Sequence, residues 1–126
     1  MREIKFRAWD KKTNEMYDVV FYDFRHNEIN IGWFNNPAWG ARARKPSEVE
    51  LMQYIGRKDK NGEEGYHHDL FLHSSRNGGK PIEVVWHENG WHGKCYDLYF
   101  PLTKSELKEI EFIGNRFDNP ELLEAI

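Results

Sequence analysis

Hydrophobic and polar residues alternate with a period of two along the first part of the chain. Between residues 3 and 9, the even positions hold Ile, Phe and Ala, and the positions between them hold Lys and Arg. Turn-forming residues at 10–14 interrupt the alternation, which resumes over 16–24 and, after a polar break, over 28–34. Alternation of this kind is typical of strands with one buried face, so it predicts an N-terminal β-hairpin followed by a third strand.

The alternation stops over residues 35–47, where an Asn-Asn-Pro sequence and Gly40 predict a loop. We expect the N-terminal lobe to join the rest of the chain at this loop. A further strand is predicted at 49–56, followed by a turn at 59–62 in which Gly62 is free to adopt a positive φ. A short apolar strand at 69–73 and a loop at 74–80 follow.

The segment 82–97 carries the clearest local signal for a hairpin. Its Asn89-Gly90 pair is the preferred central pair of a type I′ turn. A turn at these two residues places His87 directly opposite His92. One side of the hairpin then carries mainly apolar residues and the other mainly polar residues, a consistent division between a buried and an exposed face. The apolar side holds Ile82, Val84, Trp86, Trp91 and Cys95.

Two short helices are predicted near the C-terminus. Thr103 and Glu106 have the spacing of a capping box, which predicts a helix at about 104–109. A closing strand is expected at 110–113. Pro120, directly after Asn119, is typical of the first position of a helix, so the last residues are expected to be helical. The predicted fold class is therefore mainly β with short helices.

Composition and charge narrow the class of protein. Aromatic residues make up 15% of the chain, which excludes a disordered polypeptide, and the net charge of −3 argues against general binding of polyanions. One cysteine, Cys95, excludes an intrachain disulfide and fits a reducing compartment. The sequence shows neither a secretory signal nor an apolar run long enough to span a membrane, so we expect no membrane association.

The predicted loop at 35–47 is the candidate partner-binding surface. It combines one aromatic with basic residues, a composition that suits contact with phosphate and bases as well as a protein interface. A solvated loop whose tryptophan folds back on the core is the alternative. Arg57, Lys58 and Lys60 would extend the basic surface if the two loops lie close together. The candidate binding residues are Trp39, Arg42, Arg44 and Lys45.

Five of the six histidines fall between positions 67 and 92, and they raise the question of a metal site: His67, His68, His73, His87 and His92. Directly opposite residues on an antiparallel ladder have β-carbons about 4.5–5.5 Å apart, so His87 and His92 are the candidate ligand pair. Glu83, His67, His68 or Asp69 would supply a third ligand. No established metal motif is present, and solvated histidines on a polar face are the favoured interpretation.

Other motifs in the chain fail on spacing or context. Cys95 falls on the apolar side of the predicted hairpin, so we expect a buried and inert thiol. A calcium loop counted from Asp59 would need a glycine where Glu64 stands and a bidentate acid where Leu70 stands. Gly78-Gly79-Lys80 lacks the other residues of a phosphate-binding loop. We therefore expect no catalytic residues and no cofactor.

Three blocks carry a resemblance to a known family. They are residues 4–12 (IKFRAWDKK), residues 52–56 and 58–62 (MQYIG and KDKNG, followed by Tyr66 and Asp69-Leu70) and residues 113–123 (IGNRFDNPELL). In order and spacing they resemble the YopX family of phage and prophage proteins. The resemblance implies a mainly β fold with a small SH3-like barrel or roll and an N-terminal β-hairpin lobe. It implies no activity, cofactor or catalytic residue.

The resemblance also implies an organisation and a setting. It suggests one domain over residues 1–126, with an N-terminal β lobe and loop at about 1–48, the SH3-like barrel at about 49–118 and a short C-terminal helix at 119–126. A phage or prophage gene would be expressed in the cytoplasm of a bacterial host. The family usually reads Glu-Gly-Asp where this chain has His67-His68-Asp69. His68 can adopt the left-handed conformation of that glycine at some energetic cost, or Gly65 shifts the bend upstream, so the local backbone conformation stays open.

Three functions remain open at this point. The favoured one is a non-enzymatic module that binds a host or phage protein. A nucleic-acid-binding accessory factor is the first alternative, and a metal-dependent hydrolase built on the His67–His92 cluster is the second. Exposed strand edges leave a homo-oligomer open as well.

Overall fold

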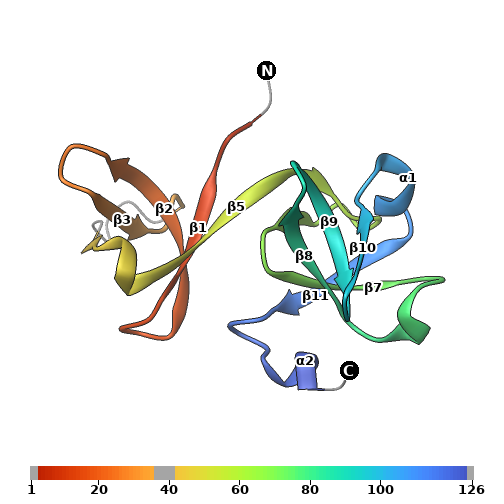
Figure 1. Ribbon diagram of the computed structural model, residues 1–126. Coiled ribbons are helices and arrows are strands. Elements are labelled where there is room, and N and C mark those ends of the chain that lie inside the picture. The colour runs from red at the N-terminus through yellow and green to blue at the C-terminus, as the bar shows by residue number, and fades with distance from the viewer. Residues whose placement is uncertain (1–2, 36–41, 125–126) are drawn as a thin grey trace. The chain divides into compact units, whose positions relative to one another are not determined.

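The computed structural model describes residues 3–35 and 42–124. The chain divides into two compact units, which we call the N-terminal unit (Glu3–Gln53) and the C-terminal unit (Tyr54 onward). Strand β5 (Val49–Lys58) runs through the boundary (Figure 1). All paired strands are antiparallel, so the predicted mainly β class is confirmed.

The N-terminal unit contains β1 (Phe6–Asp10), β2 (Glu15–Asp23), β3 (Glu28–Gly32) and β4 (Arg42–Arg44). The strand order is β4-β3-β2-β1-β5, and β6 (Glu64–Tyr66) of the C-terminal unit pairs with the second part of β5. The predicted hairpin and third strand are confirmed. Strand β4 and a 3-10 helix at Pro46–Glu48 correct the prediction of a continuous loop. Their short lengths hide any periodicity.

A β-bulge changes which residues of β2 face the core. Val19 pairs with Ile31, but the next pair is Phe21 with Asn30, so one extra residue lies in β2. The bulge leaves Val20 and Phe21 both exposed, whereas Val19 is buried. The core of this unit consists of Ala8, Tyr17, Val19, Ile29, Ile31 and Val49.

The C-terminal unit contains β7 (Asp69–His73), β8 (Ile82–His87), β9 (Gly90–Cys95), β10 (Leu98–Pro101) and β11 (Ile110–Asn115). These strands form one sheet with the order β10-β9-β8-β7-β11. Because β10 and β11 are its two outer strands, the sheet is open, and the closed SH3-like barrel that we expected is not confirmed. Strands β6 and β10 were not predicted, since each has only three or four residues.

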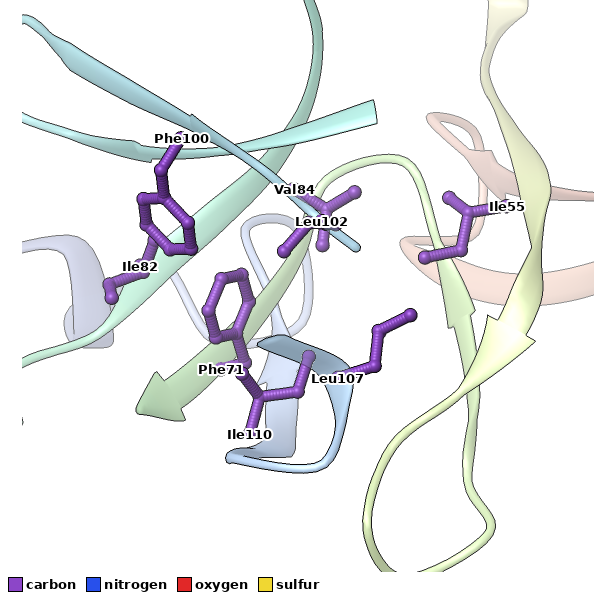
Figure 2. Close-up of a cluster of buried hydrophobic side chains, with 8 residues drawn as sticks. All are labelled: Ile55, Phe71, Ile82, Val84, Phe100, Leu102, Leu107 and Ile110. Carbon is purple, nitrogen blue, oxygen red and sulfur yellow. The ribbon is translucent and has the colours of Figure 1, made fainter. Parts of the chain in front are cut away.

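One apolar cluster fills the C-terminal unit (Figure 2). Phe71 is fully buried, and its ring packs edge-on against Phe100 and Phe112 at centroid distances of 6.2 Å. Gly93 is required beside them, because a β-carbon there would lie 2.5 Å from the Phe100 ring. The other buried members of the cluster are Ile55, Ile82, Val84, Leu102, Leu107 and Ile110.

Both short helices are present. Helix α1 (Lys104–Leu107) begins after Thr103, whose hydroxyl oxygen accepts the Glu106 N–H at 3.3 Å, so the predicted cap is confirmed. Helix α1 ends two residues earlier than predicted. Helix α2 (Glu121–Glu124) follows Pro120, as expected.

The turn between β8 and β9 is one residue earlier than predicted. His87 pairs with Gly90 and Trp86 with Trp91, so Glu88 and Asn89 form the turn. Both have positive φ, 45° and 66°, as a type I′ turn requires. The predicted pairing of His87 with His92 is therefore wrong. The partner of His87 has moved by two residues, from His92 to Gly90, so each side chain still points to its predicted side of the hairpin. Trp86 lies on the apolar side but is 55% exposed.

Candidate functional site

The basic residues of the predicted binding loop have different surroundings. Trp39 lies outside the described residues. Arg42 and Lys45 are exposed, whereas the side chain of Arg44 is almost buried. Arg44 donates from Nε and Nη2 to the two carboxylate oxygens of Asp10, at 2.9 and 3.1 Å. Arg44 thus joins β4 to β1 and contributes to the stability of the N-terminal unit.

Asp10 is the other half of this ion pair and is fully buried. It also accepts the Thr13 hydroxyl at 2.9 Å and the Lys12 N–H at 3.3 Å. Burial alone would raise the pKa of the Asp10 carboxyl, but the hydrogen bonds from Arg44, Thr13 and Lys12 outweigh it and lower the pKa. Asp10 is therefore ionised and fully hydrogen-bonded at neutral pH.

The rings of His87 and His92 lie close together, but the two residues are not directly opposite each other on the β8–β9 ladder. Their ring centroids lie 5.3 Å apart in an edge-on arrangement. His87 stacks on Tyr99 at 3.7 Å, and His92 donates from Nδ1 to the Gly90 carbonyl at 3.0 Å. Across the described residues, no three His, Cys, Asp or Glu side chains are grouped so that they could hold one metal ion.

His67 and His68 take part in a second arrangement of ionisable groups. His68 has a φ of 72°, so of the two possibilities that the sequence left open, the left-handed residue is His68 and not Gly65. Its Nδ1 lies 2.8 Å from Glu83 Oε2, and Arg116 donates to the same oxygen at 3.2 Å. The rings of His67 and His68 stack at 3.7 Å. This arrangement connects the β6–β7 turn, β8 and the segment after β11.

The pKa values of Glu83 and His67 are both lower than usual in this arrangement. Burial alone would raise the pKa of Glu83, but the hydrogen bond from His68 and the charge of Arg116 hold it below its usual value. Burial lowers the pKa of His67 to about 4, and the nearby His68 and Arg116 act in the same direction. Glu83 therefore remains ionised and His67 remains neutral near pH 7.

The low pKa of His67 predicts acid sensitivity. His67 binds a proton near pH 6.5 when the chain is unfolded but only near pH 4 when it is folded. The unfolded state thus binds more protons between these pH values, so stability decreases as pH falls from about 6.5 to 4. We expect a loss of about 2 kcal/mol, and a smaller loss in His67→Gln. Urea denaturation across this pH range measures it; identical profiles for both proteins would contradict it.

His73 is buried and belongs to a third group of polar side chains. Its Nδ1 accepts the Ser75 N–H at 3.0 Å, and its Nε2 lies 2.5 Å from Glu106. The Arg76 guanidinium donates to both Glu106 oxygens and holds the pKa of Glu106 below its usual value. The Ser75 hydroxyl lies 3.5 Å from the same Nδ1, whose lone pair already accepts a backbone N–H. This geometry positions the loop after β7 and does not activate Ser75 as a nucleophile.

A groove of about 490 Å³ lies beside β10 and adjoins this group. We call it the β10 groove; its apolar lining includes Tyr96, Leu98, Tyr99 and Phe100. Tyr96 and Leu98 are 59% and 73% exposed. Cys95 also lines the groove, and its partial burial raises the pKa of its thiol. No pattern in the sequence indicated this groove, because β10 has only four residues and gives no periodic signal.

The fold and these sites define an antiparallel, mainly β protein with two separate cores and grooved surfaces. The chain belongs to the YopX family, because the family described as "YopX protein" matches residues 5–124. This confirms the resemblance found in the sequence. A comparison with curated proteins gave no significant match.

Two solved structures share the fold along the whole chain. Protein EF1440 from Enterococcus faecalis is 24% identical with a TM-score of 0.66, and the match covers 98% of this chain and 99% of that one. Protein yopX from Bacillus subtilis is 17% identical with a TM-score of 0.61, covering 97% and 98%. Within residues 3–35 and 42–124, no helix has the length and hydrophobicity needed to cross a bilayer.

Proposed function

We propose that this protein is a non-enzymatic binding module that docks on a protein partner through the β10 groove. The observation that carries the proposal is the coincidence of a concave surface with exposed apolar side chains from one hairpin. Tyr96 and Leu98 lie at the β9–β10 turn and strand start, and both border the groove. Aromatic residues beside a pocket are typical anchors of protein interfaces.

The local backbone supports this role. Tyr96 has a φ of 54° in the tight turn between Cys95 and Leu98, which a non-glycine residue rarely adopts. Buried Phe100 forms part of the groove lining. A bound partner would remove the exposed apolar surface of Tyr96 and Leu98 from water, which favours association by about 25 cal/mol per Å².

The edge of β10 is poorly suited to the addition of another strand. All four residues of β10 lie opposite residues of β9, and the Leu102 N–H donates to the Trp91 carbonyl. Opposite pairs of an antiparallel ladder are alternately hydrogen-bonded, so Leu98 and Phe100 are the residues bonded to β9. The backbone N–H and C=O groups of Tyr99 and the C=O group of Pro101 therefore point to the outer edge of the sheet. Pro101 has no N–H, so that edge offers few donors. Side-chain docking in the groove is therefore favoured over pairing of strands, including pairing with a second copy of this chain.

A non-enzymatic role agrees with the state of the ionisable groups. Glu83, Glu106 and Asp10 are each neutralised by an arginine or histidine partner. The family resemblance favours a partner from a bacterial host or a phage, and it supports a location in the bacterial cytoplasm.

Affinity capture from phage-infected host cells tests the proposal. We expect the protein to recover one partner in a stoichiometric amount, and Tyr96→Ala/Leu98→Ala to lower its affinity at least about tenfold. Phe24→Ala is the matched control, because Phe24 is 84% exposed but belongs to the N-terminal unit. Recovery of no partner, or an equal loss in the control, would refute docking at the β10 groove.

A further inference from the structure

A second pocket, of about 350 Å³, is lined mainly by cations. Two segments of the C-terminal unit form it: the end of β5 with the turn that follows, and helix α1. We call it the basic pocket. Its charged lining consists of Arg57, Lys58, Lys60, Lys104 and Lys108, with Asp59 as the one carboxylate. The whole chain carries a net charge of −3, so this pocket is a local concentration of positive charge on a protein that is otherwise acidic.

Asp59 fixes the turn that presents the first three cations. Its Oδ1 accepts the N–H groups of Asn61 and Glu63, both at 2.9 Å, and its Oδ2 accepts the Phe112 N–H at 2.9 Å. The turn is thereby tied to β11. Asp59 is buried, and its oxygens are occupied by backbone donors, so it is not an ion-pair partner of the surrounding lysines.

Helix α1 presents the other two cations. Buried Leu107 anchors the helix in the core. Lys104 is the first residue of the helix and Lys108 is its C-cap, which keeps right-handed helical backbone angles. The two side chains are four residues apart and therefore lie on the same side, where like charges repel. Both are exposed. A negatively charged ligand would relieve this repulsion.

None of the five cations forms an ion pair with another side chain in the described ranges 3–35 and 42–124. Other basic residues of the protein do form ion pairs. Arg44, Arg76 and Arg116 are each bound to a carboxylate. The charges of the basic pocket are thus free to bind an external anion.

We infer that the basic pocket binds the phosphate groups of a nucleic acid backbone. Five cations exceed the charge of one phosphate, and they extend over two separate segments, as contacts to successive phosphates require. The lining contains no aromatic side chain on which a base would stack. The contacts therefore fall on the backbone and should not depend on base sequence. This inference is independent of the β10 groove.

Fluorescence anisotropy with a labelled 20-base-pair DNA duplex tests the inference. With five phosphate contacts, affinity should fall about 500-fold between 50 and 200 mM salt. Lys104→Ala/Lys108→Ala should lower the slope of log K against log salt by about two. Arg25→Ala/Lys80→Ala removes the same charge from exposed positions outside the pocket and should leave the slope unchanged. Circular dichroism verifies that both variants are folded.

Three results would overturn the inference. They are absent or salt-insensitive DNA binding, equal effects of the two double variants, and binding of inorganic tripolyphosphate as tight as that of the duplex. The last would assign the pocket to a small polyphosphate. Because the β10 groove is untouched by these variants, partner capture through Tyr96 and Leu98 should persist in both.

Discussion

Replacement of Arg44 by Ala should destabilise the protein by about 3 kcal/mol. The substitution leaves the fully buried Asp10 carboxylate without the guanidinium that neutralises it. A buried charge that loses its partner is costly, whereas the same pair on the surface contributes at most about 1 kcal/mol. The free energy of unfolding in urea measures the loss.

The control for this substitution is Arg25→Ala, which removes an exposed arginine from the β2–β3 turn and should change stability by less than about 0.5 kcal/mol. Asp10→Asn combined with Arg44→Ala should be more stable than Arg44→Ala alone, because the uncompensated charge is gone. An Arg44→Ala protein as stable as the parent would show that the ion pair contributes nothing. Any test of Arg44 in ligand binding must include this stability measurement.

The pH dependence of the ion pair has a defined sign. The folded-state pKa of Asp10 is lower than its value of about 3.9 in an unfolded chain. Its contribution is therefore complete above that value and is lost as pH falls through the folded-state pKa. In Arg44→Ala the part of this contribution that comes from the guanidinium disappears, while the hydrogen bonds from Thr13 and Lys12 remain.

Replacement of Gly114 by Ala should destabilise the C-terminal unit by about 3 kcal/mol. Gly114 has a φ of 154°, and a β-carbon there would lie 2.2 Å from Asn119 Oδ1. That oxygen accepts the Asn115 N–H at 3.3 Å. The added methyl group must therefore strain the backbone and also displace the Asn119 side chain from the turn between β11 and helix α2.

Gly62→Ala is the matched control for Gly114→Ala. Gly62 also has a positive φ, 81°, but no atom lies within 4 Å of the position of an added β-carbon. Gly62→Ala should destabilise by about 1 kcal/mol, from backbone strain alone. Urea denaturation of both variants separates strain from steric overlap. Equal losses would indicate that the contact with Asn119 is unimportant.

Each family block contains a polar residue with a structural role. Asp10 of the first block binds Arg44, and Asp59 of the second ties its turn to β11. Asn115 of the third block accepts the N–H groups of Phe117 and Asp118. These residues stabilise the fold. The β10 groove lies outside the blocks, whereas the basic pocket takes most of its lining, residues 56–60, from the region of the second block.

Local sequence patterns were sufficient to predict the long strands, the Thr103 cap and the turn at 59–62. The family resemblance indicated an unusual backbone near His68 but left open whether His68 or Gly65 would form the bend. Each pattern depends on residues close in the chain, because alternation, capping and turn preferences act over a few positions. Short strands such as β4 and β10 contain too few residues for a periodic signal.

Only the tertiary structure decided which distant residues meet. It shifted the β8–β9 turn to Glu88-Asn89 and separated His87 from His92, although Asn89-Gly90 was the stronger local signal. It paired Arg44 with Asp10, 34 residues away, and gathered Lys58 with Lys104 in one pocket. Such pairings depend on the packing of whole strands against the core, which a window of a few residues does not contain. The sequence thus determined the class of fold, and the packing determined where its binding surfaces lie.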